Sequence, residues 1–418
     1  MPKYAIRGGR RLTGSVKING RKNAALPLIA ATLLAEGTSV LENVPRIRDV
    51  EIYREMLDIL GVQTEYDPVE HRLTVNPAGL RPAPIPHHLA GAIRASYYLL
   101  GVQLGLFGWA EVPLPGGDKI GQRPVDQHIK ALTALGADVW MERGVLKARA
   151  DRLRGTSIYF DLVSVGATIH TMLVAVRAEG TTVLHNAARE PHVVDVANFL
   201  NACGAQIHGA GTDTIRIRGG RFLEGRRHCV IPDDIEAATF MLAGAITWGD
   251  IRVENVIPLH LGPVIAKLRE AGVEVEENGD NVRVTVKRRP RGIPVTTLPY
   301  PGFPTDAQSQ MTAFLSLAEG ESHVTETLYE DRFRYVPDLV RMGARIRVEG
   351  RTAWIQGVER LTGVPVEATD IRAGAALVLA GLAAEGVTIV SGIEHVERGY
   401  DDLPGRLNQL GAEIERID

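Results

Sequence analysis

The stretch Ala373-Gly-Ala-Ala-Leu-Val-Leu-Ala-Gly-Leu-Ala-Ala-Glu-Gly386-Val-Thr-Ile-Val390 combines three features that recur along the chain. An apolar segment with the length of a helix comes first, Gly386 ends it, and an alternating apolar run follows. Glycine readily adopts the left-handed backbone conformation that terminates many helices. The order therefore predicts a helix, a glycine cap and a strand. Because Ala373–Ala384 is apolar on nearly every face, the helix should be buried on all sides.

The same order of apolar helix, glycine and strand occurs six times in 418 residues. The capping glycines recur at intervals of 71, 72, 69, 71 and 66 residues: Gly37, Gly108, Gly180, Gly249, Gly320 and Gly386. A second series follows more amphipathic helices, at intervals of 75, 68, 68, 71 and 68 residues: Gly61, Gly136, Gly204, Gly272, Gly343 and Gly411. A fixed period of this kind indicates a repeat architecture. Each unit of about 70 residues should carry two helices and several short strands.

The two kinds of helix predict where each belongs. The amphipathic helices, such as Asp49–Leu60, should face solvent, whereas the apolar ones should lie inside. The apolar set is Ala24–Ala35, Ala95–Leu106, Thr168–Ala178, Ala237–Thr247, Ala307–Leu317 and Ala373–Ala384. We therefore expect an α/β fold with helices inside and sheets outside. By symmetry, six units divide most simply into two groups of three.

Composition limits the possible functions. A chain of this length predicts two or three domains, and 45% hydrophobic with 23% charged residues is typical of soluble globular proteins. Its formal charge is 47 − 50 = −3, which does not favour nucleic acid or an acidic membrane as partner. Cys203 and Cys229 cannot form a structural zinc site, and no metal-ligand spacing is found, so we expect no cofactor. Without a secretory signal or membrane span, a cytoplasmic location is expected.

Polar residues gather where the six apolar helices begin. They are Lys22-Asn23, Arg94, Ser164-Val165-Gly166, Asp233–Glu236, Thr305-Asp306 and Asp370-Ile371-Arg372. Helix N-termini present free N–H groups and partial positive charge, so they bind anions. Ser, Asp and Asn there could equally be ordinary N-caps. Cations oppose the helix dipole, however, so capping does not account for Lys22, Arg94 or Arg372, and an anion site is predicted.

The segment Leu114-Pro-Gly-Gly-Asp-Lys-Ile-Gly-Gln-Arg-Pro-Val-Asp126 is the most unusual local sequence. Two of its glycines have the spacing of a phosphate-binding loop, but Gln122-Arg123 replaces the Lys-Ser/Thr that nucleotide hydrolysis requires. We expect instead a mobile loop that carries Asp118, Lys119 and Arg123 over a ligand. A solvated surface loop is the alternative.

Several motifs resemble one enzyme family. They are Lys22-Asn-Ala-Ala-Leu-Pro, the 114–126 segment, Val163-Ser-Val-Gly-Ala-Thr168, Asn186-Ala-Ala-Arg-Glu-Pro191, Phe303-Pro-Thr-Asp306, Ala368-Thr-Asp-Ile-Arg-Ala373 and Arg398-Gly-Tyr400. In this order, from Tyr4 to the end, the chain resembles the UDP-N-acetylglucosamine enolpyruvyl transferases. The resemblance implies an inside-out α/β barrel of two halves with three repeats each. Residues 1–21 plus 232–418 should form one half, joined by the N-terminal strand 4–18. Residues 22–231, with an active-site loop at 115–123, should form the other.

The resemblance also implies an activity and its substrates. It is transfer of the enolpyruvyl group of phosphoenolpyruvate to the 3-hydroxyl of UDP-N-acetylglucosamine, with release of phosphate, at the first committed step of peptidoglycan synthesis. The partners would be these small molecules, with no nucleic acid or membrane. Lys22, Arg123 and Arg398 match cations of the family's phosphate side. Arg332 and Arg372 match those of its carboxylate side, and the two halves should close around the substrates.

The remaining site residues are assigned in the same way. Asp306 matches the general base, and Lys22 and Arg398 count among the catalytic cations. Asp118 stands where many relatives have a cysteine that acts in protonation. A carboxyl group can serve as the acid, but aspartate variants escape fosfomycin because they lack the thiol that it alkylates. The substrate-binding positions are Asn23, Arg94, Arg123, Ser164, Val165, Gly166, Arg332, Asp370 and Arg372.

Three departures concern the nucleotide. Leu162 stands where lysine is common, Asp234 where arginine is expected, and Gln127 where leucine is usual. An enolpyruvyl transferase with a different acceptor therefore stays open, as does a catalytically silent nucleotide-sugar-binding protein. A further alternative is 5-enolpyruvylshikimate-3-phosphate synthase, whose Leu-Pro-Gly-Ser-Lys-Ser start is absent here.

Overall fold

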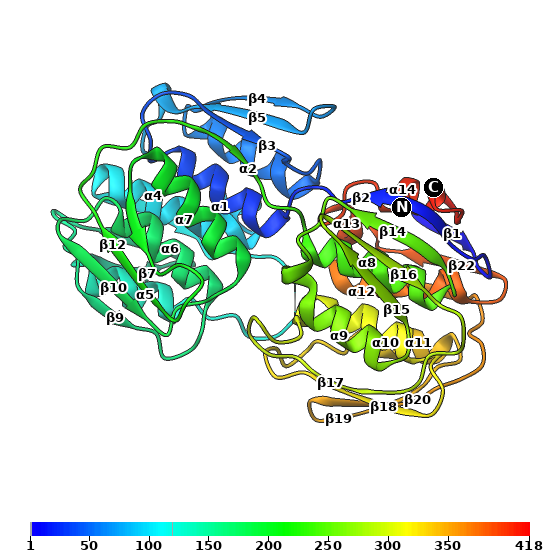
Figure 1. Cartoon of the computed structure of the whole chain (residues 1–418). Helices are drawn as coiled ribbons and strands as arrows, with labels where there is room; N and C mark the ends of the chain where they lie inside the picture. Colours follow the sequence, from blue (N-terminus) through cyan, green and yellow to red (C-terminus); the bar gives the residue numbers. More distant parts are fainter. Residues whose placement is uncertain (1, 119) are drawn as a thin grey trace. The chain divides into compact units, whose positions relative to one another are not determined.

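The computed structural model describes residues 2–118 and 120–418 (Figure 1). The chain separates into two compact units. Unit 1 comprises Met1–Asn19, Asp118–Gln122 and Pro232–Asp418, and unit 2 comprises Gly20–Gly117 and Arg123–Ile231. Met1 and Lys119 lie outside the described residues, so the expected place of Lys119 in the 115–123 loop is not described.

Unit 2 contains three repeats. Its inner helices contact one another in sequence, α1 with α4 and α4 with α6. The elements are α1 (Lys22–Thr32), β3 (Ser39–Glu42), α2 (Arg48–Ile59), β4 (Gln63–Asp67), β5 (Arg72–Asn76), η1 (Pro77–Gly79), α3 (His87–Ala90), η2 (Arg94–Tyr97), α4 (Tyr98–Phe107), β6 (Trp109–Pro113), α5 (Asp126–Ala134), β7 (Asp138–Glu142), β8 (Val145–Arg149), β9 (Ser157–Tyr159), α6 (Val165–Ala175), β10 (Thr181–His185), α7 (Pro191–Cys203), β11 (Gln206–His208), β12 (Thr214–Arg218) and β13 (Arg227–Cys229).

Unit 1 repeats this plan around α8, α10 and α12, which contact one another pairwise. Its elements are β1 (Lys3–Arg7), β2 (Thr13–Lys17), α8 (Asp234–Ile246), β14 (Asp250–Glu254), η3 (Pro258–Leu261), α9 (Gly262–Glu270), β15 (Glu274–Asn278), β16 (Asn281–Thr285), β17 (Pro294–Thr296), η4 (Thr305–Ala307), α10 (Gln308–Leu315), β18 (Glu321–Thr325), α11 (Val336–Arg341), β19 (Arg345–Glu349), β20 (Thr352–Gln356), β21 (Pro365–Glu367), α12 (Ile371–Ala383), β22 (Val387–Ser391), α13 (Ile393–Glu397), α14 (Leu403–Gln409) and β23 (Glu413–Ile417).

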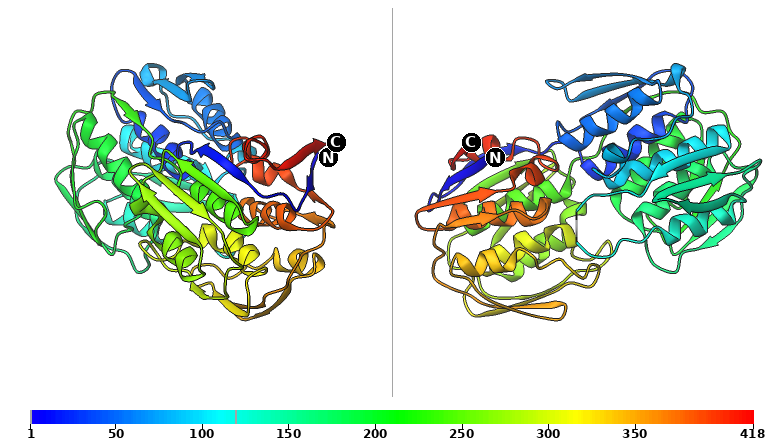
Figure 2. Two further views of the ribbon diagram at one scale, coloured as in Figure 1. Left: turned by 45° about the vertical axis from the view of Figure 1, so that its right-hand side comes forward. Right: turned by 180° about the vertical axis from the view of Figure 1, so that it is seen from behind.

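Each unit places its apolar helices inside and its sheets outside (Figure 2). The sheets formed by the described residues have the orders β13-β3-β5-β4, β6-β8-β7 and β11-β12-β10-β9 in unit 2, and β15-β16-β14-β2, β17-β18-β20-β19 and β21-β22-β1-β23 in unit 1. Except in the β6 sheet, a short strand pairs in parallel with the strand that follows the capping glycine. The expected fold class, with helices inside and three repeats in each half, is confirmed.

The N-terminal segment differs from the single strand expected over residues 4–18. It forms two strands, and both pair with strands of unit 1. β1 lies between β22 and β23 and completes the last repeat, whereas β2 runs parallel to β14 in the fourth. Residues between β1 and β2 turn the chain from one sheet to the next, which a pattern of alternating residues could not reveal.

The repeated glycines adopt the left-handed conformation that the pattern predicts, with Gly249 as the exception. There, Trp248 takes the positive φ of 55° instead. Glycine is still required at 249, because a Cβ atom would lie 2.6 Å from the carbonyl oxygen of Leu12. At this position glycine is needed because the backbone of residue 249 lies close to that of Leu12, and not because of its φ angle.

The chain passes between the units near residues 20 and 231, and backbone hydrogen bonds join these two segments. On the unit 1 side, the Asp233 N–H donates to the carbonyl of Asn19 at 2.9 Å, and Asn19 N–H donates to the buried carboxylate of Glu236 at 3.1 Å. On the unit 2 side, the Arg21 N–H donates to the carbonyl of Ile231 at 2.8 Å. The two connecting segments are therefore paired at both ends.

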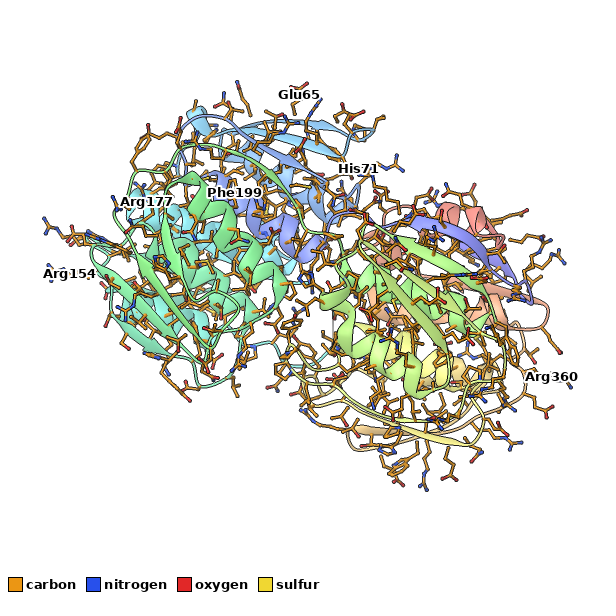
Figure 3. All side chains as sticks on the ribbon, in the orientation of Figure 1. Glu65, His71, Arg154, Arg177, Phe199 and Arg360 are labelled. Carbon is orange, nitrogen blue, oxygen red and sulfur yellow. The ribbon has the colours of Figure 1, made fainter. Side chains whose placement is uncertain are left out.

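The hydrophobic core forms two clusters, one in each unit. Phe199 of α7 is fully buried among the helices of unit 2, whereas the side chains of Arg154 and Arg360 extend outward from their units (Figure 3). Among the described residues, no helix combines the length and apolar character needed to cross a lipid bilayer.

The contact between α4 and α6 supplies a test of the packing. A Cβ atom at Gly101 would lie 2.5 Å from the His170 ring and 2.8 Å from Val174, so G101A should overpack the core. We expect a loss of about 1–3 kcal/mol in the free energy of unfolding, despite the better helix propensity of alanine. Urea titration of the pure protein measures it.

The control is G105A, one turn further along the same helix. Its Cβ would meet Arg177 at 3.2 and 3.3 Å, where a shift of a few tenths of an ångström suffices. Its stability should stay within about 1 kcal/mol of the wild type. Equal stability of G101A and the wild type would contradict the tight helix contact.

Candidate active site

In unit 1, one carboxylate lies against two buried guanidinium groups. The Asp306 carboxylate accepts a hydrogen bond from Arg332 at 2.5 Å and another from Arg372 at 3.2 Å. Arg332 and Arg372 are 3% and 4% exposed. Buried charges are stable only when they are paired and hydrogen-bonded. The two guanidinium groups that share this carboxylate therefore form a cluster of donors suited to binding a carboxylate.

Surrounding groups hold the two arginines in place. Burial opposes the charge of Arg332, but the carboxylates of Asp306, Asp370 and Glu326 more than offset it and raise its pKa above the ordinary value. Arg372 lies 5.4 Å from the centroid of the Tyr400 ring, whose hydroxyl contacts Thr239. Both guanidinium groups thus stay charged at every physiological pH.

Asp370 has a structural role in the same place. It is the N-cap of α12, and its side chain accepts hydrogen bonds from the N–H groups of Arg372 and Ala373 at 2.9 and 3.0 Å. Asp370 is therefore an N-cap, as the alternative interpretation of these polar residues predicted. Its side chain fixes the start of the helix that carries Arg372.

Asp118 lies beside Arg398, with 3.4 Å between carboxylate oxygen and guanidinium nitrogen. Arg398 follows α13 as its C-cap. Asp118 and residues 120–122 belong to unit 1, where Ile120 is buried and its carbonyl accepts from the N–H of Asp331 at 3.2 Å. The Gln122 N–H donates to Glu330 at 3.2 Å. The segment thus rests on the residues that immediately precede Arg332.

In unit 2, further cations lie at helix starts. Lys22 is the first residue of α1, and its ammonium group lies 3.4 Å from the buried carboxylate of Asp49. Asn23 follows it in the helix. Arg94 begins η2, lies 5.4 Å from the centroid of the Tyr97 ring and donates to the carbonyl of Pro124 at 3.3 Å.

Gly117 lies between two of the predicted cations. A Cβ atom built on it would be 3.5 Å from Arg94 and 3.7 Å from the guanidinium group of Arg123. Its φ of 101° also favours glycine. The structure therefore brings Arg94 and Arg123 to the same short segment.

The start of α6 is shaped by a close contact. Ser164 is its N-cap and accepts from the N–H of Ala167 at 3.2 Å, and Val165 begins the helix. A Cβ atom at Gly166 would lie 2.3 Å from the hydroxyl of Tyr97, so glycine is required. Tyr97 thus joins this helix start to Arg94.

Two histidines lie beneath Gly166. The Nδ1 atoms of His128 and His170 are 3.0 Å apart, and both rings are buried. Burial lowers the pKa of His128 well below its usual value and that of His170 to about 3. The pair is therefore neutral, and the positive charge here comes from arginine and the helix dipole.

The three departures from the family pattern fall at two places. Gln127 is buried, accepts from the N–H of Asp161 at 3.0 Å and donates to its carboxylate at 3.2 Å. Leu162, next in the chain, is 67% exposed. Asp234 is the first residue of α8 in unit 1, next to the capping Asp233. Gln127 therefore shapes the loop that presents Leu162.

The structure thus groups the predicted residues by unit. Unit 1 brings together Asp306 with Arg332 and Arg372, and Asp118 with Arg398. Unit 2 holds Lys22, Asn23, Arg94, Arg123 and Ser164–Gly166. The sequence did not single out Tyr97 or Glu326, since neither matches a motif. Nowhere in the described chain do three or more His, Cys, Asp or Glu side chains cluster as metal ligands.

Comparison with known proteins places the chain. The family model for EPSP synthase (3-phosphoshikimate 1-carboxyvinyltransferase) matches residues 6–407. The UDP-N-acetylglucosamine 1-carboxyvinyltransferase 3 of Symbiobacterium thermophilum is 65% identical and covers 99% of this chain and 98% of its own. The protein of the same name from Caldanaerobacter subterraneus is 53% identical, with full coverage of both chains. The crystal structure of the enolpyruvyl transferase NikO from Streptomyces tendae superposes with a TM-score of 0.90 at 28% identity, covering 100% of this chain and 99% of the other.

An α/β scaffold with buried arginines around a carboxylate defines an anion-handling enzyme, and the chain belongs to the carboxyvinyl (enolpyruvyl) transferase family. Within that family, the resemblance to the UDP-N-acetylglucosamine branch is confirmed by the names of its relatives. It is accordingly a transferase.

Removing Asp306 tests the charge balance. D306A leaves Arg332 and Arg372 without this partner, so unfolding should require about 3–5 kcal/mol less. Malonate, a small dianion, should stabilise D306A more than the wild type, because it binds only the folded state. Thermal unfolding with and without malonate measures both effects.

The matched control is D250A, which removes a carboxylate that accepts two hydrogen bonds from Arg283 at a more exposed pair. It should cost under about 1 kcal/mol and show no added response to malonate. An equal loss in both variants would show that the arginines do not depend on Asp306.

Proposed function

We propose that this chain transfers the enolpyruvyl group of phosphoenolpyruvate to the 3-hydroxyl of UDP-N-acetylglucosamine and releases phosphate. The observation that carries the proposal is the Asp306 carboxylate held by two buried arginines in a chain whose relatives bear that activity in their names. The reaction is the first committed step of peptidoglycan synthesis, so we place the protein in the cytoplasm. Its roles would be cell wall biogenesis, cell shape and division.

The donor substrate needs cations for both of its ends. We assign its carboxylate to Arg332 and Arg372, because guanidinium groups bind carboxylates through paired hydrogen bonds. The phosphate is assigned to Lys22, Arg123 and Arg398, with Arg94 as a further cation.

The carboxylate of Asp306 occupies the hydrogen-bond donors that this substrate requires. When the substrate carboxylate binds Arg332 and Arg372, it competes with Asp306 and frees it to accept a proton. A general base must be within hydrogen-bond reach of the proton that it takes. Substrate binding would therefore also prepare the base.

The reaction then proceeds by addition and elimination. The 3-hydroxyl oxygen bonds to C2 of phosphoenolpyruvate while Asp306 takes the hydroxyl proton and Asp118, in its protonated form, donates a proton to C3. In the second step the bond between C2 and the phosphate oxygen breaks, phosphate leaves, and C3 returns a proton to a base. Asp118, at the position where many relatives have cysteine, is the acid beside Arg398.

The acceptor is assigned to Asn23, Asp370 and the start of α6 at Ser164–Gly166. Free N–H groups there suit a diphosphate. The 65% identical relative favours this acceptor over another activated sugar. Leu162 is exposed and Gln127 is buried, so we expect the contacts around the nucleotide to differ in detail from the usual family pattern.

Phosphate release from phosphoenolpyruvate decides among the alternatives. We expect release with UDP-N-acetylglucosamine, none with shikimate 3-phosphate, and a fall of about 100-fold or more in kcat for D306A. Calorimetry would detect sugar-nucleotide binding without turnover, which would establish the silent homologue instead. Turnover only with another nucleotide sugar would establish a different acceptor.

Fosfomycin tests the role of position 118. The wild type should be insensitive, because a carboxylate opens the epoxide far less readily than a thiolate does. D118C should become inactivated with time and gain the mass of one inhibitor molecule. Stoichiometric inhibition of the wild type, or a mass shift on Asp118, would exclude the assignment.

A further inference from the structure

The repeats allow an internal comparison at the residue that ends one strand. It stands six residues after each capping glycine: Asn43, Leu114, Asn186, Asn255, Glu326 and Gly392. Backbone hydrogen bonds establish the equivalence. The Phe160 N–H donates to the carbonyl of His185 at 3.1 Å, just before Asn186, and the Thr297 N–H donates to that of Thr325 at 3.0 Å, just before Glu326.

Asparagine at this position has a structural role. Asn43, Asn186 and Asn255 all have φ of 56°, and each side-chain amide donates to a carbonyl at the end of the neighbouring parallel strand, at 2.9, 2.9 and 2.7 Å. Glu326 does not repeat this contact. In the fifth repeat the equivalent carbonyl, of Thr297, accepts from the hydroxyl of Thr327 at 2.6 Å. Thr327 therefore makes the contact with the neighbouring strand that asparagine makes in three other repeats, and the Glu326 side chain makes different contacts.

Glu326 is fully buried and collects four donors. One carboxylate oxygen accepts from the Thr297 hydroxyl at 2.9 Å and from the N–H groups of Leu328 and Tyr329 at 2.8 and 3.2 Å. The other accepts from the Thr305 hydroxyl at 2.8 Å. A carboxylate has about four acceptor positions, so these four donors largely fill them.

Three of these four donors lie on the two segments that meet at Asp306. Thr305 immediately precedes Asp306, and Leu328 and Tyr329 begin the loop that leads to Arg332. Arg332 closes the ring, because it donates to the carbonyl of Thr305 at 3.3 Å as well as to Asp306. One side chain therefore ties together the segments that carry the base and its guanidinium partner.

We infer that Glu326 is a positioning residue for the transfer reaction: its carboxylate fixes the Thr305 turn against the 327–332 loop and so sets Asp306 relative to Arg332. This role rests on the function proposed above. Glu326 is fully buried, and within the described chain its carboxylate forms hydrogen bonds with none of the residues proposed to act on the substrate, so it acts only through these two segments. Small displacements of catalytic groups can lower rates by about 100-fold, so the effect should be measurable.

E326Q is the first test. Its amide has the same shape but only one acceptor oxygen, so when that oxygen faces the 328–329 N–H groups the NH2 group faces Thr305, and the hydrogen bond from the Thr305 hydroxyl must reverse. We expect kcat/KM for phosphoenolpyruvate to fall about tenfold or more, while KM for UDP-N-acetylglucosamine stays within about twofold. The control is E321Q, which removes the same charge from the exposed first residue of β18 and should match the wild type.

T305V is the second test, and it does not alter the buried charge. It removes the hydroxyl that links Glu326 to the Asp306 turn, so it should lower kcat/KM in the same direction. Because both variants break one link, the double variant should be no slower than the slower single variant. A general structural role would instead give additive losses and a lower unfolding midpoint for the double variant.

The outcomes separate the two proposals. Wild-type kinetics in T305V, or additive losses in the double variant, would overturn the positioning role while the wild type still releases phosphate. If E326Q fails to fold, T305V alone decides. A wild-type chain that releases no phosphate with UDP-N-acetylglucosamine would overturn the proposed function and, with it, the role of Glu326.

Discussion

The charge balance around Asp306 is the constraint on which the site depends. Two guanidinium groups that are almost fully buried are stable only while carboxylates compensate them, and Asp306 contacts both. The fold must therefore bring η4, the loop before α11 and the start of α12 to one place. The turn η4 precedes the inner helix α10, and Arg372 lies in the first turn of the inner helix α12. The loop that carries Arg332 follows strand β18. Under the proposed function, the substrate carboxylate would compete with Asp306 for these two guanidinium groups.

The repeats explain why the helix starts are available for chemistry. Ser164, Asp233 and Asp370 cap α6, α8 and α12, so the free N–H groups of these helices are partly satisfied without a ligand. Arg94 and Asp306 stand instead on 3-10 turns that precede α4 and α10 and have no side-chain cap. Side-chain capping is thus present at the starts of α6, α8 and α12 and absent at the turns that precede α4 and α10.

The sequence predicted the inner helices and the glycine turns because both depend on local patterns with a fixed period. It did not predict that Trp248 takes the left-handed conformation in place of Gly249, nor that Gly249 lies close to the distant carbonyl of Leu12. For the same reason the family resemblance pointed to Asp306 and Arg332, whereas nothing in the sequence pointed to Glu326, whose partners lie up to 29 residues away in the chain. Long-range contacts decide these positions, and no local pattern reports them.

Departures from the repeat mark the functional segments. Three repeats keep asparagine where the strand ends, and there the chain continues into the solvent-facing helices α2, α7 and α9. The other three have Leu114, Glu326 and Gly392, and each substitution precedes a segment with a proposed catalytic or substrate-binding residue: Asp118, Arg332 and Arg398, respectively. The asparagine side chain links the end of the strand to the neighbouring parallel strand by a hydrogen bond, and the chain then continues in the same direction in all three repeats. Where another residue stands there, the following segment takes a different course, and these segments carry Asp118, Arg332 and Arg398 of the proposed site.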